Sequence, residues 1–437
     1  MKFLCGAACE IITPPVGTLL YGYTPDVVSE SVHDDLTATA LAVGDGTQTA
    51  LLVSLTLGDV HTALCDELRE AAATAAGIDA SDVIIASTHT HCGPNTSGME
   101  GWGEIDRGYV DGILLPAVRL SAENAVKNMT DAVVGSACGE SRVGINRRQQ
   151  LENGNIDFGQ NPWGCYDPNM TVLAFRRADN GEGILNLVHY GCHGTACGKA
   201  VEITRDWSGM MLDRMEKLTG TLSVFFNGAI GDVGPRLTNG ATVGDITYVE
   251  ELGSAAAMDA MEIFGKIKSF YQPELKVHKG TVKLPYKKFP TLSEVQNRLS
   301  EIREPEKLIN IERLEYGYYK SVEELLLSGT EQPEGEFSYP QTIVEIGNSV
   351  FIPFPFEHFS ETSLRLREYS GFQNTLTLSC TNGYNGYLPT ESELCRGGYE
   401  VGVFRFASAY SLADNTDQNI INENLRIIRE NSAESIE

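Results

Sequence analysis

The stretch Ile84-Ile85-Ala86-Ser87-Thr88-His89-Thr90-His91-Cys92-Gly93-Pro94 says most about the fold of this 437-residue chain. A short apolar run ends in two histidines two residues apart, and Gly-Pro follows at once, which indicates a buried strand that stops here. Side chains at positions i and i+2 of a strand point the same way. We therefore expect His89 and His91 to project together from the strand end into one cavity.

A second histidine-rich stretch, residues 189–195, follows the apolar run 184–188. Half of the eight histidines of the chain therefore lie at the ends of two predicted strands. Imidazole is a common metal ligand, and zinc suits imidazole combined with carboxylate oxygens. The pattern predicts a zinc site at the carboxyl ends of strands, and both His189 and His193 are candidates for its second half.

The first third of the chain alternates between strand and helix patterns. Residues 37–43 and 49–55 flank Gly44-Asp45-Gly46, which predicts a β-hairpin, and the Ala/Leu/Glu-rich stretch 62–76 predicts a helix. A strand at 83–86 follows. This order favours an α/β fold with parallel strand pairs and a mixed β-sheet core flanked by helices.

The same patterns continue to the C-terminus. We expect helices at 109–127, 246–268 and 356–368, strands at 222–226 and 375–379, and a hairpin formed by 342–345 and 349–352. The charged, Leu/Glu-rich residues 290–330 predict a helical insertion on the surface. No repeat or flexible linker interrupts the pattern, so we expect one large domain over residues 1–437.

Composition excludes several classes of partner. The formal charge of −26 argues against nucleic acids and anionic membranes, because phosphates attract Lys/Arg-rich surfaces. No apolar run reaches the roughly 20 residues of a transmembrane segment, and the N-terminal apolar run is too short for a signal peptide. Ten scattered cysteines then favour free thiols and a cytoplasmic location.

Short motifs follow one another in a fixed order over most of the chain. They are 11–17 (IITPPVG), 88–94 (THTHCGP), 144–147 (GINR), 170–173 (MTVL), 192–195 (CHGT), 206–209 (DWSG), 228–235 (GAIGDVGP), 355–357 (PFE), 364–366 (LRL), 384–387 (YNGY) and 398–400 (GYE). Together they resemble the catalytic domain of the neutral/alkaline, non-lysosomal ceramidases and their bacterial relatives. The resemblance implies an α/β catalytic domain, here without the C-terminal immunoglobulin-like domain of the secreted members.

The resemblance also implies a zinc ion (Zn²⁺) and the hydrolysis of an N-acyl amide. The four implied zinc ligands match His89, His193, Glu357 and Tyr387, and the implied substrate-facing residues match His91, Arg147 and Tyr399. Two histidines and a carboxylate suit a catalytic zinc ion that keeps a position open for water. A tyrosine ligand is unusual, so Tyr387 is alternatively a hydrogen-bond donor to an oxyanion.

Three positions depart from the family pattern. Gly234 replaces a serine, Cys92 replaces another serine, and Phe356 replaces the glycine before Glu357. Because glycine has no hydroxyl group, we expect zinc-activated water to attack directly, with His91 as general acid or base. A small or amphipathic acyl amide fits the chain better than membrane ceramide.

Several alternatives remain open. The same metal site serves an esterase or a lactonase, and Gly234 is also compatible with a catalytically inactive ligand-binding homologue. Asp206 and Asp232 either orient metal ligands or cap turns. Arg147 adjoins Arg148 in the sequence, and we expect one of the two to face solvent.

Overall fold

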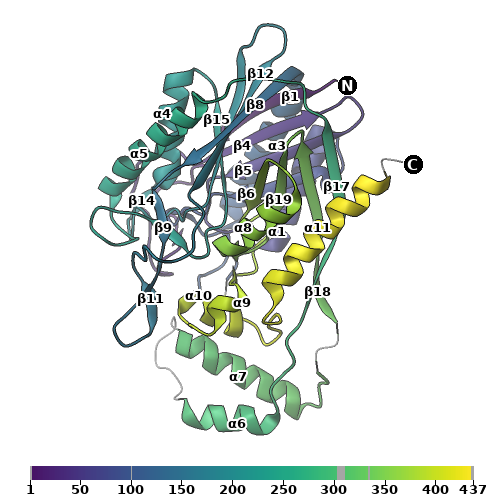
Figure 1. The fold of residues 1–437 in the computed structure, drawn as a ribbon. Helices are drawn as coiled ribbons and strands as arrows, with labels where there is room; N and C mark the ends of the chain where they lie inside the picture. The colour runs from purple at the N-terminus through teal and green to yellow at the C-terminus, as the bar shows by residue number, and fades with distance from the viewer. Residues whose placement is uncertain (1, 100, 303–310, 333–334, 435–437) are drawn as a thin grey trace.

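The computed structural model describes residues 2–99, 101–302, 311–332 and 335–434. Its largest element is a mixed eight-stranded sheet of order β15-β13-β12-β8-β1-β4-β5-β6 (Figure 1). The strands are β1 (Leu4–Ile11), β4 (Thr37–Gly44), β5 (Thr49–Leu55), β6 (Val83–Ser87), β8 (Thr130–Glu140), β12 (Asn169–Arg177), β13 (Gly183–Tyr190) and β15 (Ser223–Asn227). This confirms the predicted α/β class with a mixed sheet.

A strand–helix–strand unit with a parallel strand pair occurs three times in the described part of the chain. The units are β5-α1-β6, β13-α4-β15 and β19-α8-β21. Their further elements are α1 (Thr62–Ala76), α4 (Asp206–Thr219), α8 (Ser360–Ser370), β19 (Ser349–Pro353) and β21 (Asn374–Leu378). In such units the loops after the strands gather at one edge, where α/β proteins place their sites.

A second sheet packs against the first. Its order is β17-β18-β19-β21, with β17 spanning Leu275–Pro285 and β18 spanning Glu336–Ile346. One buried cluster joins Phe175 and Leu187 of the large sheet to Phe351 and Leu376 of the small one. The sheets therefore form the two middle layers of the molecule.

Helices cover the outer faces of both sheets. The large sheet carries α1, α3 (Leu115–Lys127), α4 and α5 (Ile246–Phe264), and the small sheet carries α8 and α11 (Thr416–Glu434). Shorter helical segments are α2 (Arg107–Tyr109), a π-turn at Val110–Leu114, a 3₁₀ turn at Ala80–Asp82, α9 (Glu391–Leu394) and α10 (Tyr399–Phe406). Among the described residues, no helix is both long enough and apolar enough to cross a membrane.

Short strand pairs shape the edge where the loops meet. They are β2 (Leu20–Tyr21) with β7 (Gly93–Pro94), β3 (Ser31–Val32) with β14 (Glu202–Ile203), β9 (Gly144–Asn146) with β16 (Val233–Pro235), β10 (Arg148–Gln150) with β11 (Ile156–Phe158), and β20 (Glu357–His358) with β22 (Tyr387–Leu388). The helix predicted over 356–368 begins only at Ser360, because Glu357 and His358 belong to β20.

The segment 290–330 contains two helices, α6 (Leu292–Glu301) and α7 (Ile311–Leu327), while residues 303–310 lie outside the described part. The two helices lie below the sheets, and α7 runs beside α10 (Figure 1). Ile311 and Leu314 at the start of α7 pack against Tyr387 and Val403. This segment is therefore in contact with the edge that carries the candidate site.

Candidate metal centre

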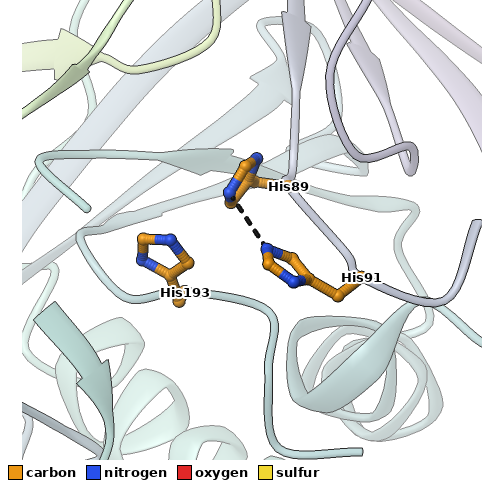
Figure 2. Close-up of side chains that lie close together, drawn as sticks. All are labelled: His89, His91 and His193. Atoms are coloured by element: carbon orange, nitrogen blue, oxygen red, sulfur yellow. Dashed lines mark hydrogen bonds between the residues drawn. The ribbon is translucent and has the colours of Figure 1, made fainter. Parts of the chain in front are cut away.

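Three histidines from two loops meet at the carboxyl ends of the strands. His89 and His91 follow β6, and His193 follows β13; their donor nitrogens all lie within 4.8 Å of one another (Figure 2). Nε2 of His89 lies 3.2 Å from Nε2 of His91. The strand itself ends at Ser87 and His89 has φ of 62°, so a left-handed turn, and not strand alternation, brings the two rings together.

Glycines permit the close approach of the loops. A Cβ atom at Gly194 would lie 2.7 Å from the carbonyl oxygen of His89, and one at Gly231 would lie 2.5 Å from the carbonyl oxygen of Glu357. Real Cβ atoms do not approach backbone this closely. The Gly-rich sequences after β13 and β15 therefore allow these two loops to pack against the segments that carry His89 and Glu357.

Nδ1 of each of two histidines is held by an oxygen atom. Asp59 Oδ1 lies 2.9 Å from Nδ1 of His89, and the carbonyl oxygens of Ile230 and Val233 lie 2.8 and 3.0 Å from Nδ1 of His193. Because these oxygens can only accept, Nδ1 is the protonated nitrogen in both rings. In the neutral form of each ring the lone pair is therefore on Nε2, as in metal-binding histidines.

Glu357 completes the convergence. Its Oε2 lies 2.9 Å from Nε2 of His193 and 3.5 Å from Nε2 of His89, while its Oε1 accepts a hydrogen bond from the Tyr384 hydroxyl at 2.8 Å. With the ring proton of His193 on Nδ1, however, Nε2 has no hydrogen to donate to Oε2 of Glu357. Both buried atoms are therefore without a hydrogen-bond partner in the described part of the chain. Buried polar atoms of native proteins are normally paired, so these two need another partner.

A divalent cation fits these donors. Ligand atoms placed tetrahedrally around zinc at about 2.0–2.2 Å stand about 3.3–3.6 Å apart. Oε2 of Glu357 lies within this range of Nε2 of His89, at 3.5 Å, and is closer to Nε2 of His193, at 2.9 Å. Two neutral imidazoles and a carboxylate are also the donor types that zinc prefers.

The charges of the site pull the histidine pKa values apart. Burial alone would lower the pKa of His89, but the carboxylates of Asp59 and Glu357 outweigh it and raise that pKa to about 9. Burial, assisted by the charge of Arg147, lowers the pKa of His193 to about 3. Burial opposes ionisation of Glu357, yet the neighbouring histidines and Arg147 hold its pKa well below the usual range.

Tyr387, Arg147 and Tyr399 form one cluster beside Glu357. Tyr387 pairs with Glu357 across β20 and β22, and its hydroxyl oxygen accepts a hydrogen bond from Nη2 of Arg147 at 3.0 Å. The ring of Tyr399 lies 5.8 Å from that of Tyr387 and 5.4 Å from that of Phe158. The structure thus brings all seven residues singled out in the sequence to one edge of the fold.

The expectation that Arg147 or Arg148 faces solvent was wrong. Arg147 is 5% and Arg148 1% exposed, because the carboxylate of Glu400 lies between them. Sequence reasoning also missed Asp59, Tyr384 and Glu400. Asp59 had a local signal, as a polar residue soon after the apolar run of β5, and Tyr384 and Glu400 lie within the motifs YNGY and GYE.

Other candidates lie outside the cluster. Nε2 of His189 lies 2.8 Å from the carbonyl oxygen of Thr377, and its pKa is lowered by burial, so this histidine is structural. Asp206 accepts hydrogen bonds from the amides of Ala196 and Cys197, and Asp232 from the amide and hydroxyl of Ser360. Each aspartate therefore fastens a loop that adjoins a residue of the candidate metal centre.

Gly234 occupies a space with no room for a side chain. A Cβ atom there would lie 2.8 Å from Cβ of Thr242 and 3.4 Å from Cβ of Arg147. Thr242 is buried. The space that a serine side chain would need at position 234 is therefore already filled by Thr242.

An apolar cavity of about 480 Å³ adjoins the cluster on the side of α10. Its wall includes Tyr387 and also Tyr384, which donates to Glu357. Aromatic residues elsewhere in the wall include Tyr286, Phe337 and Phe404. None of the described residues that line it carries a charge. Its volume is typical of small-molecule sites, which are mostly apolar with a few polar groups at one end.

Buried histidines and a carboxylate at the carboxyl ends of parallel strands define an α/β protein with a candidate metal centre. The fold is that of a ceramidase. Neutral ceramidase from Pseudomonas aeruginosa superposes with a TM-score of 0.73 at 19% identity, over 98% of this chain and 74% of that chain. A ceramidase complexed with C2 gives 0.74 at 18% identity over the same shares. No family model matches the sequence, and no curated protein does.

Proposed function

We propose that this protein is a zinc-dependent hydrolase that cleaves the amide bond of an N-acyl amide. The proposal rests above all on Nε2 of His193 and Oε2 of Glu357, which face one another in the buried cluster without hydrogen-bond partners. His89, His193 and Glu357 would hold the ion, with Tyr387 as the fourth ligand. When bound, zinc polarises a carbonyl group and makes water a stronger acid.

The remaining groups have the chemistry that amide hydrolysis requires. The His91 ring lies beside His89, its Nδ1 has no partner among the described residues, and an imidazole can take a proton from water and pass it to the departing amine. Tyr399 supplies a hydroxyl donor for the developing oxyanion, and Tyr387 is the alternative donor if it does not bind the ion. Arg147 balances negative charge that develops on the substrate or product.

The uncharged cavity supports a substrate with an apolar acyl or amine part. Its wall is continuous with Tyr384 and Tyr387, so an amide carbonyl at the cluster would place one substituent in the cavity. A small or amphipathic acyl amide is therefore the proposed substrate class. The cytoplasmic location stays a prediction from the sequence.

The test uses the purified full chain, stripped of metal and reloaded with zinc. We expect turnover of N-acyl amides ranging from acetyl to long-chain acyl groups, loss of turnover in the metal-free protein, and recovery on adding zinc. Matched esters are assayed in parallel. Turnover of esters alone would favour an esterase or lactonase, and retained zinc without any turnover would favour a ligand-binding homologue.

A further inference from the structure

Two consecutive arginines share one buried carboxylate. Nε of Arg147 donates to Oε1 of Glu400 at 2.9 Å, and Nη1 of Arg148 donates to Oε2 of the same residue at 2.6 Å. The Glu400 side chain is only 2% exposed. Glu400 thereby joins the start of α10 to the junction of β9 and β10, two segments about 250 residues apart in the chain.

The two arginines then diverge. Arg148 also contacts Glu393, at 3.0 Å, and the carbonyl oxygen of Gly397, so it ties down the turn before α10. Arg147 points the other way: its guanidinium carbon lies 5.0 Å from the centroid of the Phe158 ring and 5.6 Å from that of the Tyr387 ring. Only Arg147 reaches the candidate metal centre.

We propose that Glu400 is a positioning residue, which holds Arg147 so that its Nη2 donates to the Tyr387 hydroxyl. Contacts with two aromatic rings do not by themselves fix the direction in which a guanidinium group donates. The hydrogen bond from Nε of Arg147 to Glu400 fixes that direction. With one Tyr387 lone pair bound to Arg147, the oxygen presents its remaining lone pair in one direction. The inference rests on the proposed function, which places Tyr387 at the metal.

Glu400→Gln tests the proposal, with Glu393→Gln as matched control because Glu393 contacts Arg148 but not Arg147. A glutamine replaces one of the two acceptor oxygens by an NH2 group, so one of the two arginines would face a donor. We expect Glu400→Gln to lower kcat at least tenfold with little change in KM, and to weaken zinc binding in a chelator competition several-fold. We expect Glu393→Gln to stay within about threefold of the wild type in each measurement.

Glu400→Asp keeps the buried charge but is one methylene shorter, so it tests the position if the glutamine variant does not fold. Its kcat should also fall. The proposal is overturned if folded Glu400→Asp matches the wild type, or if the Glu393 and Glu400 variants are impaired alike. Zinc affinity tests the positioning independently of turnover. If the wild type binds zinc but hydrolyses no amide, the proposed function fails. The comparison of zinc affinities among the variants then still decides the role of Glu400.

Discussion

The carboxylate of Asp59 lies 2.9 Å from Nδ1 of His89, on the side of the ring opposite the candidate metal centre. Its other oxygen accepts a hydrogen bond from the Tyr21 hydroxyl at 2.8 Å, so the carboxylate is held from both sides. This carboxylate–histidine arrangement fixes the ring and increases the donor strength of Nε2. Asp59 thus supports the candidate metal centre, although we do not propose it as a ligand.

Asp59→Asn should weaken zinc binding by about 10–100-fold while leaving the protein folded. The amide keeps an acceptor for His89 but removes the charge that favours zinc-bound imidazole. Competition with a coloured chelator measures the change. Asp66→Asn, at an exposed carboxylate on α1, serves as control. An unchanged affinity in the Asp59 variant would show that the ring is held by packing alone.

His193→Ala should abolish zinc retention and amide turnover together, since it removes a ligand from the centre of the cluster. His189→Gln is the informative comparison, because His189 also lies near the end of β13 but, among the described residues, its ring bonds only to the carbonyl oxygen of Thr377. Glutamine preserves a donor to that oxygen, so metal content and turnover should stay near wild type. Metal analysis after dialysis, with circular dichroism for folding, decides between the two histidines.

The sequence located the histidines correctly but for the wrong geometric reason. Apolar runs that end in histidine are local signals, and they identified the loops after β6 and β13. The pairing of His89 with His91 depends instead on a left-handed backbone conformation at His89, which no periodicity indicates. Local patterns therefore found the edge of the sheet and not the conformation at that edge.

Partners that come from distant segments could not be predicted from local patterns. Glu400 meets Arg147 and Arg148 only because α10 packs against the β9–β10 junction. We expected one exposed arginine because the two residues are adjacent in the sequence. Both are buried instead, because each donates to the buried carboxylate of Glu400. The positions of Glu357 and Tyr387 were likewise accessible only through the family resemblance, because β20 and β22 are too short to leave a pattern.

Gly234→Ser should destabilise the protein and give no gain in rate. The new Cβ would lie 2.8 Å from Cβ of Thr242, and overpacking of this kind costs about 1–3 kcal/mol. Thermal unfolding and turnover of the best amide substrate measure the two effects. Adding Thr242→Gly removes the clash, so the double variant should recover part of the stability. A faster single variant would show that the serine hydroxyl is accommodated and used.

Asp206 should make the stability of the fold depend on pH between about 4 and 6. Burial raises its pKa to about 6, although the amides of Cys197, Trp207 and Ala196 donate to it and oppose the shift. The folded state therefore holds a proton that the unfolded chain releases at lower pH. The protonated Asp206 therefore stabilises the folded state. This stabilisation is complete below about pH 4, falls as pH rises, and is lost above about pH 6.

The matched variant is Asp206→Asn, because Asp206 has φ of 58° and asparagine tolerates the left-handed region as well as aspartate does. Relative to the variant, the wild type should lose about 3 kcal/mol between pH 4 and pH 7, from a shift of roughly two pKa units in a fully buried group. Urea unfolding at a series of pH values gives the difference directly, since the other acidic groups are common to both proteins. A difference that is constant with pH would mean that the three amides keep Asp206 ionised throughout, and that the loop after His193 is fastened by charge at every pH.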